Sequence, residues 1–250
     1  MDIDFKPTEE MASNAERGLA LREKHGRGGT AIGVARARDI KAVPGLPRVA
    51  GLDVAEFGSD SSALCVRQGP VLVHLSEWRG VDVMTTTGRV AKAYRDRAPG
   101  FDVVYVDAIG MGAGVAERLA ELRVPVVRVN VAESSALSPR FRRLRDELWW
   151  SVRDWFEGRA CRIGPEITMA EELIGQMAGV KYREMSDGRG EVKIESKAEM
   201  RKRGQPSPNM ADALCLTFAA GSASVVQSVM RGALDGREMR VEVAADYPLL

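Results

Sequence analysis

Three aspartates stand where they could bind a divalent cation. Asp53 follows the apolar run 49–52 and Asp107 follows the apolar run 103–106, so both acids end predicted buried strands. Asp212 opens an apolar helical pattern. A carboxylate at the edge of a core is costly to bury without a partner, and three brought together would repel one another. Hard cations such as Mg²⁺ take carboxylate, water and phosphate oxygens, so this set predicts metal-assisted cleavage of a phosphodiester.

Other kinds of catalytic site find little support in the sequence. His25 and His74 are the only histidines, and neither has a serine or cysteine nearby in a nucleophile motif. A Ser-His-Asp hydrolase and a histidine-rich zinc site are therefore disfavoured. The sequence also contains no GxxxxGK[ST] pattern, so it predicts no P-loop.

A glycine run follows the second aspartate, at 110–114, between a predicted strand and a predicted helix. This arrangement partly matches the dinucleotide-binding fingerprint, but Val115 stands where the match fails. No acid ends a strand about 20 residues further on, where a ribose partner belongs. We interpret these glycines as allowing a tight turn beside Asp107, and we keep a nucleotide-binding α/β protein as a third-ranked alternative.

The elements that would position the acids follow an α/β pattern. The first half predicts strands and helices at 48–54, 62–67, 71–78, 82–97, 101–106, 110–122 and 124–129, the second and third of these forming a hairpin. The later part predicts helices at 140–156, 167–177 and 208–220, with a hairpin of 180–185 and 191–195. A strand, a glycine loop, a helix and another strand make a βαβ unit, so part of the sheet is parallel.

Composition predicts one domain with a sizeable core. The chain has 250 residues, 45% of them hydrophobic, and a net charge of +1. The breaker cluster 44–47 separates a lead-in or small helical appendage, 1–47, with a predicted helix at 12–24, from the core domain 48–221. A tail, 222–250, follows. Scattered cysteines, no signal-peptide pattern and no apolar run of ~18 residues predict a cytoplasmic protein without a membrane span.

Two basic clusters could contact phosphates, one at Arg140, Arg142, Arg143 and Arg145 and the other at Lys197, Arg201, Lys202 and Arg203. The alternative for the first cluster is a solvated helix face whose partners are Asp146, Glu147 and Asp154. Phosphate contact is favoured more strongly for the second cluster, which lies just before Asp212.

These segments together resemble the nuclease domain of the large terminase subunit of tailed bacteriophages. The resemblance covers about residues 48–221 and depends on the order of its motifs: Gly51-Leu52-Asp53-Val54-Ala55 with Gly58 and Asp60, Val106-Asp107-Ala108-Ile109-Gly110-Met111-Gly112, Glu147-Leu148-Trp149-Trp150, Glu195-Ser196-Lys197, Arg201-Lys202-Arg203-Gly204 and Ser207-Pro208-Asn209-Met210-Ala211-Asp212-Ala213. It implies a ribonuclease H-like fold, a mixed sheet flanked by helices, and an endonuclease that cuts concatemeric viral DNA during genome packaging.

The resemblance also implies roles for individual residues. Asp53, Asp107 and Asp212 would be the catalytic residues and the ligands of two divalent cations, Mg²⁺ or Mn²⁺. Asp60 and Asn209 would be further ligands. The family often has an acid or histidine at the position of Asn209, so the asparagine of this chain would hold the second metal more weakly. Lys197 stands where the family has a lysine after its hairpin and would contact DNA or the scissile phosphate. With Arg201, Lys202, Arg140 and Arg143 of the two basic clusters, it would hold double-stranded DNA with little sequence preference.

The chain departs from the family upstream of the core, because 47 residues cannot hold an ATPase motor. We therefore expect a nuclease-only or truncated phage or prophage product, or an excised domain, acting in the host cytoplasm. Its expected protein partners are the small terminase subunit, the portal or a separate motor. The alternatives are another ribonuclease H-like nuclease, such as a junction resolvase, and a non-catalytic packaging or assembly module.

Overall fold

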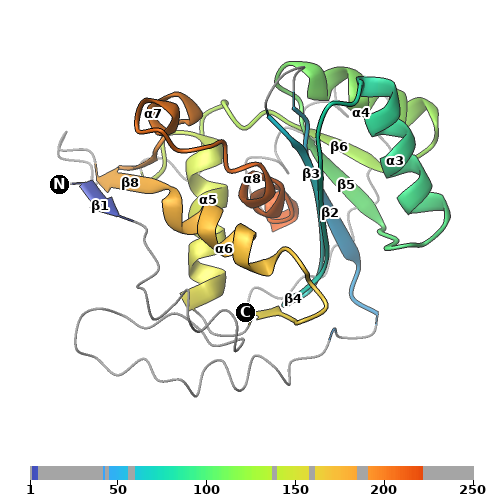
Figure 1. Cartoon of the computed structure of the whole chain (residues 1–250), viewed down its shortest axis with the longest axis horizontal. Coiled ribbons are helices and arrows are strands. Elements are labelled where there is room, and N and C mark those ends of the chain that lie inside the picture. Colours follow the sequence, from blue (N-terminus) through green and yellow to red (C-terminus); the bar gives the residue numbers. More distant parts are fainter. Residues whose placement is uncertain are drawn as a thin grey trace.

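A mixed six-stranded sheet forms the centre of the molecule (Figure 1). The computed structural model describes residues 2–4, 42, 45–55, 60–136, 140–157, 161–184 and 191–221. The order of strands across the sheet is β6-β5-β2-β3-β4-β7. Their bounds are β2 Arg48–Asp53, β3 Ser62–Gln68, β4 Val71–Trp78, β5 Val103–Asp107, β6 Val126–Val129 and β7 Arg162–Ile163.

The sheet changes direction at β2, which pairs antiparallel with β3 and parallel with β5. β3 and β4 form the predicted hairpin, and β5 and β6 pair in parallel. The chain reaches β5 from the hairpin through α3 (Val83–Arg95) and passes from β5 to β6 through α4 (Met111–Glu121). The predicted βαβ unit and the α/β class are therefore confirmed.

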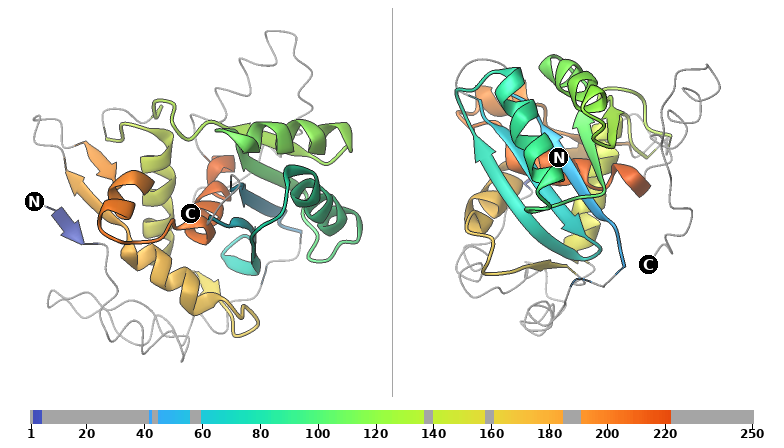
Figure 2. Two further views of the ribbon diagram at one scale, coloured as in Figure 1. Left: turned by 45° about the horizontal axis from the view of Figure 1, so that its top comes forward. Right: turned by 90° about the vertical axis from the view of Figure 1, so that its right-hand side faces the viewer.

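Helices cover both faces of the sheet. α3 and α4 lie on one face, and α5 (Leu144–Glu157), α6 (Ala170–Gly179) and α8 (Asn209–Leu216) lie on the other (Figures 1 and 2). Along β2, Ala50 and Leu52 belong to the core under α3 and α4, whereas Val49 belongs to the core under α5, α6 and α8. This alternation explains why the strand is apolar at almost every position.

A small three-stranded sheet lies beside α5. It contains β8 (Lys181–Glu184), β9 (Val192–Ile194) and the strand β1 (Asp2–Asp4), which pairs with the outer edge of β8. The hairpin leads into α7 (Lys197–Lys202), which begins with a capping box between Ser196 and Glu199. A single 3₁₀ turn, η1 (Ala219–Gly221), follows α8.

Several boundaries differ from the sequence predictions. α5 begins at Leu144 and not at 140, because Phe141 and Arg143 make isolated β-bridges to Val192 and Ser134. β1, β7 and α7 were not predicted, since two to six residues give no clear periodicity. The predicted helix at 12–24 lies outside the described residues. In the described part of the chain, no helix combines the length and the apolar character needed to cross a bilayer.

Candidate active site

Asp53 and Asp107 end two neighbouring parallel strands. Leu52 of β2 is paired in register with Val106 of β5, so the two aspartates come one residue after a matched pair. Neighbouring strands lie about 4.8 Å apart, and residues in register point to the same face of a parallel sheet. The two acids therefore stand side by side at the carboxyl edge of the sheet, as the sequence predicted.

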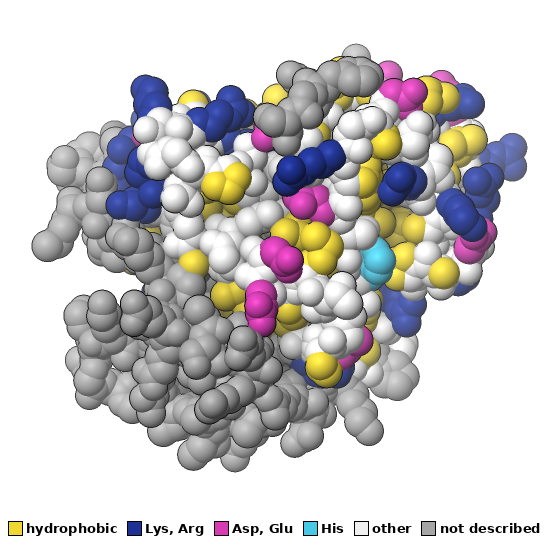
Figure 3. All heavy atoms as spheres, in the orientation of Figure 1, with side chains coloured by type: hydrophobic (Ala, Val, Ile, Leu, Met, Phe, Trp, Pro, Cys, Tyr) yellow, Lys and Arg dark blue, Asp and Glu magenta, His cyan; other side chains and the backbone are white. Residues whose placement is uncertain are grey.

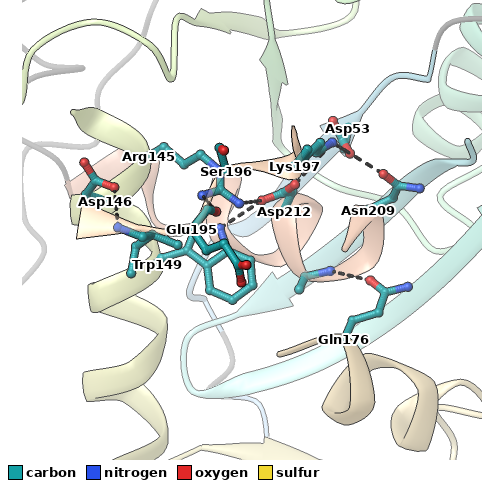
Figure 4. A network of polar contacts seen from close by, with 12 residues as sticks. Asp53, Arg145, Asp146, Trp149, Gln176, Glu195, Ser196, Lys197, Asn209 and Asp212 are labelled. Atoms are coloured by element: carbon teal, nitrogen blue, oxygen red, sulfur yellow. Dashed lines mark hydrogen bonds and ion pairs between the residues drawn. The ribbon is translucent and has the colours of Figure 1, made fainter. Parts of the chain in front are cut away.

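α8 carries Asp212 over the same edge of the sheet. The helix lies directly on β2 at Gly51, where an added Cβ would stand 2.0 Å from the carbonyl oxygen of Ala213. Asp53, two residues after Gly51, faces the same side of the strand. The N-terminus of α8 is capped from α6, because the side-chain oxygen of Gln176 accepts from the backbone N–H groups of Met210 and Ala211 at 2.9 and 3.2 Å (Figure 4).

The ammonium group of Lys197 lies among three oxygens of this site. Its nitrogen is 3.0 Å from Oδ2 of Asp53, 3.2 Å from Oδ2 of Asp212 and 3.4 Å from Oδ1 of Asn209 (Figure 4). Asp53 and Asn209 are each only 5% exposed. Asp53, Asp212 and Asn209 thus converge, as expected, and in the structure a protonated amine occupies the space between them.

The pKa values of the three aspartates show that they interact electrostatically. Burial, together with the charge of Asp212, raises the pKa of Asp53 to about 6 against the opposing effect of Lys197. Burial likewise raises the pKa of Asp107 to about 7, with the charges of Asp53 and Asp212 acting in the same direction. Burial opposes ionisation of Asp212 as well, but Arg145 and Lys197 hold its pKa below the ordinary value. Lys197 and Arg145 bring two positive charges to three carboxylates, so the site retains an affinity for further positive charge.

Two side chains of α5 contact the second carboxylate oxygen of Asp212, Oδ1. Oδ1 accepts a hydrogen bond from Nε1 of Trp149 at 2.8 Å and lies 3.4 Å from a guanidinium nitrogen of Arg145. Arg145 also donates to the backbone oxygen of Glu195 at 2.8 Å, two residues before Lys197. Sequence reasoning missed both roles. It assigned no role to Trp149 beyond its place in a motif, and it grouped Arg145 with the candidate phosphate-binding arginines.

The remaining predicted site residues lie further out. Asp60 lies 3.7 Å from Arg201, and their side chains are 40% and 62% exposed. Arg140, Arg143 and Lys202 are exposed, and the guanidinium of Arg140 stacks 5.5 Å from the ring centre of Trp150. Lys and Arg side chains gather over α7 at the upper left of Figure 3. Contact of these residues with DNA stays a prediction.

Two of the acids expected on a solvated helix face beside the first basic cluster are buried instead. Asp146 is buried and accepts from the backbone N–H groups of Arg143 and Ile194, and Glu147 is buried and accepts from Oγ of Ser135 at 2.6 Å. These acids tie α5 to its neighbours and are not part of a solvated face. Asp154 lies 3.6 Å from Arg153, outside the predicted cluster.

The glycine run after Asp107 belongs to α4 and serves close packing. An added Cβ at Gly112 would stand 1.8 Å from the carbonyl oxygen of Asp107, and Gly110 has a positive φ of 63°. The backbone N–H of Ile109 donates to Oδ1 of Asp107 at 3.1 Å. The interpretation that glycines are needed for a tight turn beside Asp107 is therefore confirmed for Gly110 and Gly112.

The donors at this site suit a hard divalent cation. They are carboxylate oxygens and one amide oxygen, which is the set that Mg²⁺ and Mn²⁺ prefer. Oδ2 of Asp212 is buried and accepts no well-aligned hydrogen bond among the described residues, so it has an acceptor position to offer. Within the described ranges, however, no three His, Cys, Asp or Glu side chains are already arranged as a metal site.

Solved structures with a similar arrangement of elements include nuclease domains of large terminase subunits. No protein-family model matches the chain, and no curated protein matches it. The nuclease domain of the large terminase subunit gp2 of bacterial virus Sf6 aligns with 86% of this chain and 98% of its own length, with a TM-score of 0.59 and 18% identity. A mutant of that domain with manganese and β-thujaplicinol gives a TM-score of 0.60 and 19% identity over 73% of this chain and 91% of that one.

The large terminase nuclease from the thermophilic phage G20c with bound magnesium is similar over 85% of this chain and 98% of its own, with a TM-score of 0.54 and 15% identity. At these identities the likeness establishes the fold. The chain has a ribonuclease H-like α/β fold. Within that class, its fold is the one found in the nuclease domains of large terminase subunits.

Proposed function

We propose that this chain is a metal-dependent DNA endonuclease of the phage terminase type, which cleaves concatemeric viral DNA during genome packaging. The observation that carries the proposal is the convergence of Asp53, Asp107 and Asp212 at one edge of a sheet with the terminase nuclease fold. The structures of similar folds with manganese and with magnesium support a divalent cation.

The proposed roles follow from the positions of the side chains. Asp53, Asp107 and Asp212, with Asn209 and Asp60 as further ligands, would hold two Mg²⁺ or Mn²⁺ ions. When bound, such ions activate water and stabilise the leaving oxygen of the phosphodiester. Lys197 would then give up its contacts with Asp53 and Asp212, and its ammonium group would turn to a phosphate of the DNA.

The exposed cations would hold the DNA backbone. Arg201 and Lys202 extend from α7, whose first residue is Lys197, and Arg140 and Arg143 precede α5. Contacts with phosphates position a duplex without reading its sequence. We therefore propose cleavage with little sequence preference and a rate that falls with increasing salt.

Nicking of supercoiled plasmid in the presence of Mn²⁺ tests this proposal. The wild-type chain should nick, whereas Asp107→Asn should lose about a hundredfold or more of the rate while remaining folded, because it removes one charged ligand oxygen. Asp154→Asn, which alters an exposed acid on α5, is the matched control and should nick at the wild-type rate. Equal rates for Asp107→Asn and the wild type would show that the site is assigned wrongly.

The lack of a pre-arranged metal cluster among the described residues favours one competing proposal, a non-catalytic packaging or assembly module. Such a module would use the ion pairs of Lys197 for stability alone. Heating with and without Mn²⁺ separates the two, because a ligand that binds the native state raises the melting temperature. A melting temperature unchanged by Mn²⁺, together with no nicking, would support the module. Faster cleavage of four-way junctions than of linear duplex would instead indicate a resolvase.

A further inference from the structure

The indole of Trp149 contacts the candidate ligand Asp212 from inside the core. Trp149 is 4% exposed and belongs to the hydrophobic core beneath α5, α6 and α8. Its single polar atom, Nε1, donates to Oδ1 of Asp212 at 2.8 Å, from one helix to another (Figure 4). An indole can donate but cannot accept or ionise, so this contact orients the carboxylate without taking away its charge.

The two oxygens of Asp212 are thereby given different surroundings. Oδ1 faces Trp149 and Arg145, both on α5. Oδ2 faces the ammonium group of Lys197 at 3.2 Å and accepts no well-aligned hydrogen bond among the described residues. Fixing one oxygen of a planar carboxylate fixes the direction of the other, so Oδ2 points into the space shared with Asp53.

Arg145 completes the arrangement and holds the indole in place. It stands one helical turn before Trp149, with its guanidinium carbon 5.4 Å from the centre of the indole ring. The same side chain reaches Asp212 with one nitrogen and the backbone oxygen of Glu195 with another. One face of α5 therefore positions both Asp212 and the turn that leads to Lys197.

We propose that Trp149 is a positioning residue, which presents Oδ2 of Asp212 to the divalent cation through the indole hydrogen bond to Oδ1. This inference rests on the proposed function, because it requires Asp212 to bind a cation. It goes beyond that function by assigning metal affinity to a tryptophan outside the ligand set. Partners of metal ligands typically change metal affinity about 10–100-fold when they are replaced.

The neighbouring tryptophan provides a matched control. Trp150 follows Trp149 on α5, is 9% exposed, and packs against Tyr182 and Phe141 in the same core. Its Nε1 has no hydrogen-bond partner among the described residues. Trp149→Phe and Trp150→Phe thus remove similar volumes from one core, but only the first removes a donor to Asp212.

Binding of Mn²⁺ is measured by the loss of the electron paramagnetic resonance signal of the free ion. Trp149→Phe should bind Mn²⁺ at least tenfold more weakly than the wild type, and Trp150→Phe should stay within about twofold. In plasmid nicking measured over a range of DNA concentrations, kcat should fall with Trp149→Phe while KM for DNA stays unchanged. Equal Mn²⁺ affinity for the wild type and Trp149→Phe would overturn the positioning role.

A measurement on the wild-type protein keeps the test decisive if Trp149→Phe does not fold. The indole ¹H–¹⁵N resonance of Trp149 should shift as Mg²⁺ is added, whereas those of Trp78, Trp150 and Trp155 should stay in place. An unmoved Trp149 resonance in a protein that binds Mg²⁺ and nicks plasmid would refute this inference and leave the nuclease proposal standing. A wild-type protein that neither binds the cations nor nicks would refute both.

Discussion

The ammonium nitrogen of Lys197 lies 3.0 Å from Oδ2 of Asp53, across 144 residues of sequence. Burial opposes the charge on Lys197, but Asp212 and Asp53 raise its pKa above the ordinary value, so the side chain is protonated. The side chain of Asp53 is 7% exposed and that of Lys197 is 33% exposed, which makes this a largely buried ion pair. The pair holds α7 against the end of β2.

Replacement of Lys197 should destabilise the cation-free protein. Lys197→Met leaves Asp53 and Asp212 buried with less positive charge nearby. Breaking a buried pair costs about 3–5 kcal/mol, and the partial exposure of Lys197 reduces the expected loss to about 2–3 kcal/mol. Urea unfolding in EDTA measures this loss of unfolding free energy. The control is Lys202→Met, at an exposed position of the same helix, which should change stability by less than about 0.5 kcal/mol. The deficit should shrink when Mg²⁺ is added, and a deficit that Mg²⁺ leaves unchanged would argue against a cation between the acids.

Replacement of Asp107 should have the opposite effect on stability. Asp107 is repelled by Asp53 and Asp212, so Asp107→Asn removes one of three like charges. In EDTA at pH 8 the variant should be more stable by about 1 kcal/mol, which corresponds to a melting temperature about 2–4 °C higher. In Mg²⁺ this advantage should vanish, since the wild type then gains more from the cation. Differential scanning calorimetry with and without Mg²⁺ would contradict the electrostatic picture if Asp107→Asn melted lower in both.

The parts of the fold that could be predicted are those with local signals. Apolar runs that end in Asp53 and Asp107 predicted two core strands. The helix with the glycine run, which connects β5 to β6, predicted that β5 and β6 are parallel. No local signal predicted that β2 is parallel to β5 as well, and it is this pairing that brings Asp53 beside Asp107, because the carboxyl ends of parallel strands meet at one edge. Asp212 needed the resemblance as well, since no local pattern shows that α8 crosses β2 at Gly51.

The parts that could not be predicted depend on long-range contacts. Trp149 has the spacing of a core residue, and its second role depends on Asp212, 63 positions away. Arg145 looks like its exposed neighbours 142 and 143, yet it turns inward to the hairpin and α8. Burial of Asp146 depends on a hydrogen bond from the backbone of Ile194, 48 residues later. Periodicity gives the face of a helix, but it does not give the partner on that face.

The capping box at the start of α7 predicts a pH dependence of stability. Glu199 accepts from the backbone N–H and from Oγ of Ser196 at 2.8 and 2.7 Å, and these hydrogen bonds lower the pKa of Glu199 to about 2. A carboxyl with a lowered native pKa stabilises the fold above its unfolded pKa, and this contribution is lost as the pH falls toward the native value.

Glu199→Gln keeps an acceptor oxygen for the capping box but loses the negative charge at the N-terminus of α7, so it should be less stable than the wild type by about 0.3–1 kcal/mol at pH 7. The difference should shrink steadily below pH ~4.5, the region in which an unfolded glutamate takes up its proton. Urea titrations at several pH values would measure it, with Glu171→Gln, an exposed position in α6, as the control. A difference that stayed constant from pH 7 to pH 3.5 would show that the negative charge of Glu199 does not stabilise the helix.

Two glycines in one turn of α4 give a test of how the backbone holds Asp107. A Cβ at Gly112 would stand 1.8 Å from the carbonyl oxygen of Asp107, whereas nothing lies within 4 Å of the same atom at Gly114. Gly114→Ala should stabilise the protein by about 0.5–1 kcal/mol, because alanine has less backbone freedom to lose in a helix. Gly112→Ala must displace either the helix or the end of β5, so it should destabilise by about 2 kcal/mol or more.

Because the displaced backbone carries Asp107, Gly112→Ala should also slow plasmid nicking at least tenfold at a temperature where it is folded, whereas Gly114→Ala should nick normally. If both variants nicked at the wild-type rate, the position of Asp107 would not depend on this contact.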